Sequence, residues 1–188
     1  MKINYCAILS VLLCASVANA KPNTEVKLIA TDKAIKNLDT AMKFVDKKSS
    51  IPVKFPKKIP QTDKTLYAVV STEGQESNYN KHWSINAADT EKCDTRACVV
   101  GGIYAEKDGK LELTYETAET HFEKPIAKEK VALVNHVTSY YTPAHTEADW
   151  HVARIEWVEN GVLYQIHWDI KGDSKKALTD MANSAIKD

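Results

Sequence analysis

The amino-acid sequence predicts an α+β fold, in which an antiparallel meander of about six to eight strands carries an N-terminal and a C-terminal helix packed on it. Three observations lead to this prediction. Apolar residues recur with helical spacing only toward the two ends of the 188-residue sequence. Between these ends, apolar and polar residues alternate with the period of a strand. Finally, Asn160-Gly161 separates two such alternating runs, as the turn of a hairpin would.

The first twenty residues have the pattern of a secretory signal peptide. Lys2 gives a positive start, Ala7–Val17 is an apolar run, and Ala18-Asn19-Ala20 is a small-x-small cleavage site. We therefore expect export, with cleavage after Ala20, to the periplasm or the exterior of the cell. We expect three segments: the signal peptide over 1–20, an N-terminal helix and linker over 21–50, and an α+β domain over 51–188 that forms one globular unit with the helix.

Two other membrane-related interpretations are less favoured. A transmembrane helix needs about 20 apolar residues, and the apolar run is shorter than that. Acylation at Cys14 would make a lipoprotein, but bulky Leu13 stands where a small residue is required.

Without Lys2, the expected mature chain has 24 basic and 25 acidic residues. This balance argues against a dedicated binder of nucleic acid or of a membrane surface.

Cleavage would leave two cysteines, Cys93 and Cys98, in the run CDTRAC. In an oxidising compartment, such a close pair is typical of a structural disulfide. Four residues separate the two, whereas a redox motif has the spacing C-x-x-C. Zinc is disfavoured because no histidine lies close to them in the sequence. We therefore expect a disulfide that contributes about 2 kcal/mol to stability.

Two amphipathic helices are expected, one at each end of the mature chain. The first covers Glu25–Val45, with Thr24 as its N-terminal cap. The second covers Lys175–Ile186, with Asp173 or Ser174 as its cap. Each helix has one apolar stripe and one charged side, which is typical of a helix packed on a core.

The central region is expected to be mostly strand. Residues 66–71, 82–88, 99–106, 111–115 and 131–141 have strand-like patterns. Asp108-Gly109 predicts a hairpin between the third and fourth of these. Ile51–Pro60 holds three prolines, so it should be extended but not a central strand. Glu116–Lys130 is polar and predicts a long loop, with a strand near Phe122 as an option, and Pro143–Asp149 predicts another loop.

The last hairpin allows its register to be predicted. A two-residue turn at Asn160-Gly161 pairs the following residues on one face: Trp157 with Tyr164, Ile155 with Ile166, and Ala153 with Trp168. The opposite face then pairs Glu156 with Gln165 and Arg154 with His167. We therefore expect the first face in the core and the second face in water.

Four strings of the sequence resemble a family of uncharacterised exported bacterial proteins. They are IPVKFPKKIP, HWSINAADTEKCDTRACVVGGIYAE, YYTP and IEWVENGVLYQIHWDIKGDSKKALTDMANSAI. The family features are a paired-cysteine loop, a Trp-x-x-Asn-Gly hairpin and a final helix with Met-Ala-Asn-Ser. Relatives often have a second cysteine pair before the last hairpin, where this chain has Thr146 and Trp150. The resemblance implies fold and export, and it brings no established activity.

One stretch of the sequence is a candidate metal site. His145, Glu147, Asp149 and His151 occupy alternate positions, and imidazole with carboxylate suits Zn²⁺, Cu²⁺ or Ni²⁺. In an extended strand, however, alternate side chains are about 6.5 to 7 Å apart, so four of them converge on one ion only if the chain bends. The favoured interpretation is a polar loop. No other cofactor is expected.

The usual catalytic motifs are absent from the sequence: there is no G-x-S-x-G, H-E-x-x-H, P-loop or dinucleotide-binding glycine pattern. Gly101-Gly102 indicates a β-bulge rather than a phosphate cradle. His167 is expected at the surface rather than as a general base. We expect Trp157, Tyr164 and Trp168 in the core rather than in a stacking platform for a ligand.

The sequence therefore favours a non-enzymatic exported domain that binds a partner protein or small ligand at the cell envelope. Two alternatives stay open. One is a metal-binding protein or metal-dependent hydrolase built on residues 145–151. The other is a carrier of a small apolar ligand, which would require a deep apolar cavity.

Overall fold

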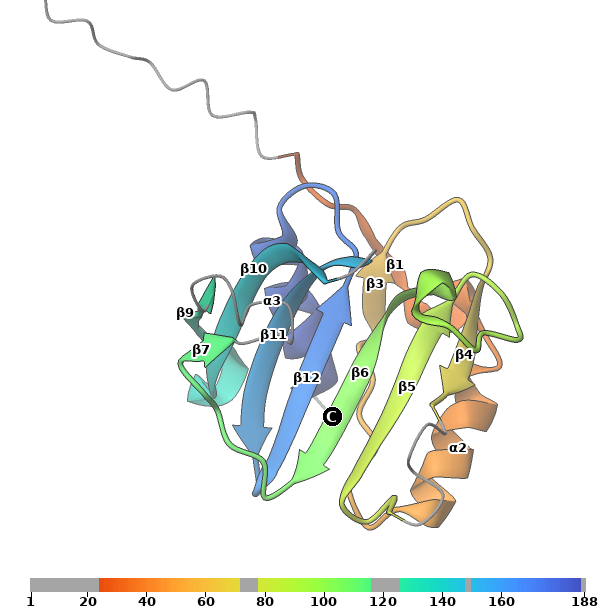
Figure 1. Ribbon diagram of the computed structural model, residues 1–188, viewed down its shortest axis with the longest axis horizontal. Helices are drawn as coiled ribbons and strands as arrows, with labels where there is room; N and C mark the ends of the chain where they lie inside the picture. The colour runs from red at the N-terminus through yellow and green to blue at the C-terminus, as the bar shows by residue number, and fades with distance from the viewer. Residues whose placement is uncertain (1–23, 72–77, 116–125, 148–149, 187–188) are drawn as a thin grey trace, which may run out of the picture.

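The computed structural model describes residues 24–71, 78–115, 126–147 and 150–186 (Figure 1). Its centre is an eight-stranded, mostly antiparallel sheet. Across the sheet, the strands follow the order β2 (Ile35–Lys36), β4 (Leu66–Val70), β5 (His82–Ala88), β6 (Val99–Lys107), β12 (Val162–Trp168), β11 (Trp150–Glu159), β10 (Thr138–Glu147) and β9 (Glu129–Ala132). The described part also holds three helices, α1 (Thr31–Ala34), α2 (Leu38–Lys48) and α3 (Ser174–Ile186). The predicted mixture of helices with a large antiparallel sheet is confirmed.

The sheet is built from two antiparallel runs rather than from the single meander that the sequence suggested. One run is β4-β5-β6 and the other is β9-β10-β11-β12, and they meet where β6 pairs with β12. At one edge, β2 pairs with β4 in parallel. Two further ribbons lie outside the sheet: β1 (Leu28–Ala30) pairs with β3 (Lys58–Pro60), and β7 (Thr114–Tyr115) pairs with β8 (Ile126–Ala127).

The register of the last hairpin is confirmed. Trp157 lies opposite Tyr164, and Arg154 lies opposite His167, as the turn predicted. Asn160 and Gly161 have φ values of 52° and 76°, so both turn residues are left-handed, as a type I′ turn requires. The local turn chemistry therefore fixes this part of the fold.

The core lies on one face of the sheet. Its largest fully buried side chains are Trp83, Trp157, Trp168 and Tyr164. α3 packs on this face against β10, β11 and β12, and α2 packs against β4 and β5. Asp173 caps α3, because its carboxylate accepts a hydrogen bond from the Lys176 N–H at 3.0 Å. None of the described helices is long and apolar enough to cross a membrane.

The predicted helix over Glu25–Val45 is wrong in its first half. The chain there forms β1, the four-residue α1 and the short β2, and the longer helix α2 begins only at Leu38. Asn37 has a φ of 60°, which breaks the helix, and Ile29 packs as a strand residue opposite Ile59. The Thr31 hydroxyl donates a hydrogen bond to the Pro56 carbonyl at 2.6 Å. The apolar residues of this region therefore do not form one long helix. Part of the region pairs instead with the proline-containing segment, which is distant in the sequence.

Three predictions in the central region are also wrong. β6 does not form a hairpin across Asp108-Gly109, because β5 and β12 occupy both of its edges. The strand expected over 131–141 is interrupted by a turn in which Asn135 and His136 are left-handed, and β10 begins after it. β10 then continues through most of the loop expected at Pro143–Asp149, with a bulge between Thr142 and His145. A strand near Phe122 falls outside the described residues.

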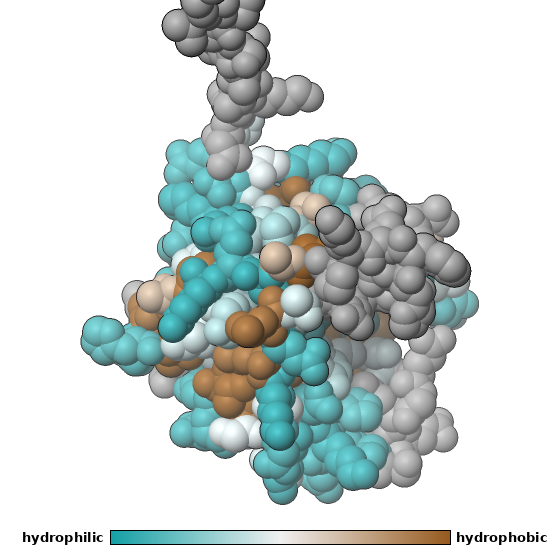
Figure 2. Space-filling view, turned by 60° about the vertical axis from the view of Figure 1, so that its left-hand side comes forward, coloured by the Kyte–Doolittle hydropathy of each residue, from teal (hydrophilic) through white to brown (hydrophobic). Residues whose placement is uncertain are grey.

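Hydrophobic side chains reach the surface at the β9 edge of the sheet. Val131, Val134 and Val137 are partly buried and pack against the core. Figure 2 turns this side forward and shows hydrophobic residues among hydrophilic ones. The edge strand itself carries exposed Glu129 and Lys130, charges that discourage pairing with another sheet edge.

Gly101 provides a test of the β6–β12 pairing. A Cβ at Gly101 would overlap the Trp168 indole and would lie 2.8 Å from the His167 carbonyl oxygen. We expect Gly101→Ala to destabilise the fold by about 1–3 kcal/mol, measured by urea unfolding, and to change the near-ultraviolet circular dichroism of Trp168.

Gly161→Ala is the matched control for this prediction. It is strained by its left-handed φ, but nothing lies within 4 Å of the added Cβ. It should therefore lower stability without changing the near-ultraviolet spectrum. A Gly101→Ala variant as stable as the native protein would contradict the pairing of Gly101 with Trp168.

Candidate binding site on the polar face of the sheet

A row of cross-strand neighbours runs over the face of the sheet opposite the core. From β10 to β4 it consists of Thr142, Arg154, His167, Gly102, Asn86 and Val69. The adjacent row on the other face holds Tyr141, Ile155, Ile166, Ile103, Ile85 and Val70. Because side chains alternate along a strand, the apolar pattern of the second row places the first row on the polar face.

The expectation that this second face lies in water is wrong for its central residues. Arg154 and Glu156 are each 5% exposed, and His167 is 8% exposed. Part of the cover comes from Lys128, between β8 and β9. Its Nζ lies 2.6 Å from Glu156 Oε2, and the two side chains are 4% and 7% exposed. A nearly buried ion pair therefore closes this part of the face.

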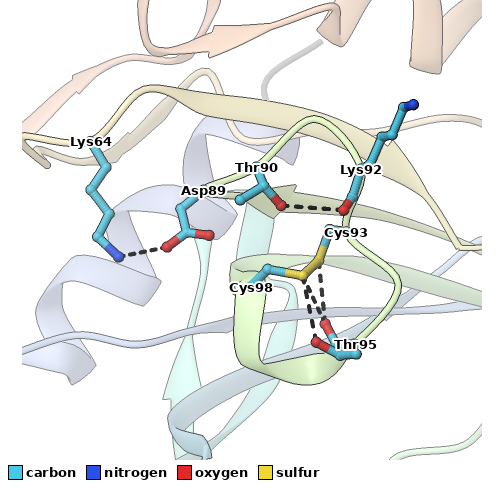
Figure 3. Close-up of a disulfide and its surroundings, with 7 residues drawn as sticks. All are labelled: Lys64, Asp89, Thr90, Lys92, Cys93, Thr95 and Cys98. Carbon is cyan, nitrogen blue, oxygen red and sulfur yellow. Dashed lines mark hydrogen bonds and ion pairs between the residues drawn. A yellow bond between two sulfur atoms is a disulfide. The ribbon is translucent and has the colours of Figure 1, made fainter.

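The loop between β5 and β6 lies over another part of the polar face, and the predicted disulfide between Cys93 and Cys98 is present in it (Figure 3). The Asp89 N–H donates a hydrogen bond to the Cys98 carbonyl at 2.9 Å, which ties the two ends of the loop together. The Asp89 carboxylate also pairs with Lys64 at 2.6 Å, as Figure 3 shows. A short 3₁₀ turn over Arg96–Cys98 then leads into β6. The loop is thus held at both ends by covalent and polar contacts.

An open hollow of about 680 Å³ lies between this loop and the sheet. It is lined by Val69, Val70, Ser71, Asn86, Cys93, Asp94, Thr95, Arg96, Val99 and His167. His167 is the most buried of its polar residues, whereas Asp94 and Arg96 are exposed at its rim. Its volume is within the range of about 300–1,000 Å³ that small-molecule sites occupy.

Gly102 is needed in the row of polar residues next to the hollow. A Cβ at this position would come within 2.7 Å of Asn86 Oδ1 and of the Ile85 carbonyl oxygen. The missing side chain therefore leaves room for the Asn86 amide, which carries both donors and acceptors. The register shift between Ala87 and Ala88 leaves Val100 as one extra residue in β6, so the bulge lies next to Gly101 rather than at the predicted Gly101-Gly102.

Burial and neighbouring charges set the protonation of this face. Burial first, and then the positive charge of Arg154, lower the pKa of His167 to about 3, so its imidazole is neutral near pH 7. Burial lowers the pKa of Arg154 to about 10, with Glu156 opposing this shift and Arg96 adding to it. Arg154 therefore stays positively charged. Burial, followed by the charge of Glu106, raises the pKa of Tyr104 to about 12, so this phenol is neutral.

This arrangement is chemically suited to holding polar groups. A neutral imidazole offers one donor and one acceptor, and the Asn86 amide offers both as well. The rim adds one carboxylate and one guanidinium, and Val69 and Val99 add apolar surface. The hollow can therefore bind a molecule that has polar and apolar parts.

The residues of the expected metal site are distributed differently. His145 lies opposite Val152 and Thr146 lies opposite His151, so the register places His145 and His151 on opposite faces of the hairpin. Glu147 is at the end of β10, opposite Trp150, and Asp149 lies outside the described residues. Within the ranges that the structure describes, no group of three or more His, Cys, Asp or Glu residues could hold a metal ion.

The aromatic residues of the last hairpin belong to the core, as expected. Trp157 is fully buried, and its ring stacks on Tyr164 with centroids 5.4 Å apart. The Tyr164 hydroxyl donates a hydrogen bond to the Pro52 carbonyl at 3.1 Å. Trp168 is 1% exposed. These rings are therefore packing residues and not a platform for a ligand.

Sequence reasoning missed that Arg154, Glu156 and His167 are covered. A signal for this was present, because the same face also carries Val152 and Leu163. Val152 is fully buried and Leu163 is 8% exposed. Apolar residues on a supposedly wet face indicate that another segment covers it.

Comparison of the chain with known protein families, with curated proteins and with solved structures finds no match.

The protonation of His167 gives a pH-dependent prediction. Its folded pKa of about 3 lies below the ordinary value of 6.5, so between these pH values the unfolded chain binds more protons than the folded one. The stability that neutral His167 contributes is fully present above pH 6.5 and is lost as the pH falls toward 3. We expect the free energy of unfolding of the native protein to fall more steeply with decreasing pH than that of His167→Gln.

Urea unfolding at several pH values between about 4.5 and 7.5 measures this difference. The imidazole resonances of His167, followed by NMR, should also show no protonation midpoint in that range. A midpoint near 6.5 would contradict the buried, neutral histidine.

Proposed function

We propose that this protein is an exported, non-enzymatic binding domain that holds a small polar ligand in the hollow between its disulfide loop and its sheet. The observation that carries the proposal is the neutral, buried His167 lining an open hollow beside Asn86. A ligand that bonds to these groups would receive fixed, directional contacts.

The absence of the usual catalytic motifs from the sequence supports binding rather than catalysis. The register of β10 and β11 favours a polar ligand over a metal ion at residues 145–151, since His145 and His151 lie on opposite faces. The apolar face argues against an apolar-ligand carrier, because Trp83, Trp157 and Trp168 fill it. The polar hollow is therefore the site that we favour.

A screen by NMR tests the proposed site. The probes are the twenty common amino acids, glucose, citrate and inorganic phosphate, each added to the mature protein. We expect at least one of them to shift the amide resonances of Asn86, Gly102 and His167. Val69→Trp, which places a large ring in the hollow, should abolish these shifts.

Leu113→Trp is the matched control, because Leu113 is 68% exposed and is not among the residues that line the hollow. It should leave every shift unchanged. If no probe shifts the three resonances, the hollow is not a small-ligand site. If a probe is chemically converted over time, the protein is an enzyme and the proposal is wrong.

Export is part of the proposal, and it rests on the pattern of the first twenty residues and on the disulfide. We expect the protein recovered from the periplasm or the medium of an expressing bacterium to begin at Lys21. Intact mass spectrometry measures this directly. A chain that retains residues 1–20, or one that begins at an acylated Cys14, would contradict the predicted cleavage.

A further inference from the structure

We propose that the ligand of the hollow is a zwitterion, specifically a free α-amino acid with an aliphatic side chain. This inference rests on the proposed function, because it assigns the chemical class of the ligand in the same site. Three features of the hollow support it: the two charges at the rim, the neutral polar residues that also line the hollow, and the apolar residues beside them.

The rim offers one negative and one positive side chain. Asp94 and Arg96 line the same hollow, and both are exposed. Within the described ranges of the chain, neither of them forms an ion pair. The Cys93–Cys98 disulfide encloses both residues in one short loop. Two opposite charges thus line one hollow, where a ligand with both charges can pair with each of them.

We expect the carboxylate of the ligand to lie at the side of the hollow that His167 lines. Arg154 is the cross-strand neighbour of His167. Arg96, across the hollow, is close enough to lower the pKa of Arg154. Arg96 lines the hollow and Arg154 does not, so an anionic group in the hollow would pair with Arg96 and be stabilised by Arg154 only at longer range. The neutral imidazole of His167 and the amide of Asn86 can hydrogen-bond to the same group without adding a net charge.

The remaining lining of the hollow fits an aliphatic side chain. Val69 and Val99 contribute apolar surface to it. Burying the methyl and methylene groups of a ligand against such residues contributes about 0.8 kcal/mol for each CH₂. An amino acid such as leucine therefore matches the three kinds of lining at once. A singly charged molecule of the same shape would gain only one of the two ion pairs.

Three probes of nearly the same shape separate these contributions. L-leucine carries both charges, N-acetyl-L-leucine lacks the ammonium, and L-leucinamide lacks the carboxylate. We would titrate each into the mature, disulfide-bonded protein at about pH 6, where an α-amino group is protonated, and follow the amide resonances of Asn86, Gly102 and His167. We expect L-leucine to bind about fivefold more tightly than either analogue, as one partly exposed ion pair allows.

Two variants link each charge of the ligand to its partner. Arg96→Gln should weaken L-leucine about fivefold and leave L-leucinamide unchanged. Asp94→Asn should weaken L-leucine and leave N-acetyl-L-leucine unchanged. Lys92→Gln is the matched control, because Lys92 is an exposed cation just outside the disulfide-closed loop and does not line the hollow. It should change none of the three affinities.

The results also distinguish this inference from the proposed function. If either analogue binds as tightly as L-leucine, or if each variant weakens all three probes equally, the ligand is not recognised as a zwitterion. If L-leucine fails to shift the hollow residues while citrate, glucose or phosphate does, the amino-acid assignment is wrong and the binding site stands. If no probe shifts them, both proposals are wrong.

Discussion

The pairing of β12 with β11 on one side and β6 on the other is the constraint on which both faces of the sheet depend. Each pairing extends over seven residues. Since side chains alternate, placing Ile166 and Trp168 in the core necessarily places His167 on the opposite face. A shift of one residue would bring the imidazole into the core. Gly101 accommodates the Trp168 ring, and Gly102 leaves room for the Asn86 amide. The same strand thus builds the core and the candidate site.

The buried charges of the polar face need charged or polar groups from other segments of the chain, whereas the apolar face needs only apolar packing. Buried Arg154 and Glu156 can be kept in place only if charged or polar groups meet them. Lys128 does so for Glu156, and the disulfide loop covers another part of the face. The hollow lies between that loop and the sheet. The candidate site therefore arises where a polar segment, the disulfide loop, covers the polar face of the sheet. The loop and the sheet leave a space between them.

The sequence predicted those parts of the fold that depend on local chemistry. The turn at Asn160-Gly161 determines the last hairpin, and the close spacing of Cys93 and Cys98 determines the disulfide. It did not predict the pairing of β6 with β12, because Asp108-Gly109 gives an equally strong local signal for a different hairpin. The partner of Glu156 was also not predictable, since Lys128 comes from a polar segment without periodicity. Long-range pairing decided both cases.

The claim that charged and polar segments cover part of the polar face is tested most directly by a double-mutant cycle on Lys128 and Glu156. The free energy of unfolding would be measured by urea for Lys128→Met, Glu156→Leu and the double variant. Breaking a buried pair by removing one partner costs about 3–5 kcal/mol, and removing both costs much less. We predict a coupling energy of about 2 kcal/mol or more. A coupling below about 0.5 kcal/mol, as for a pair exposed to water, would contradict the account.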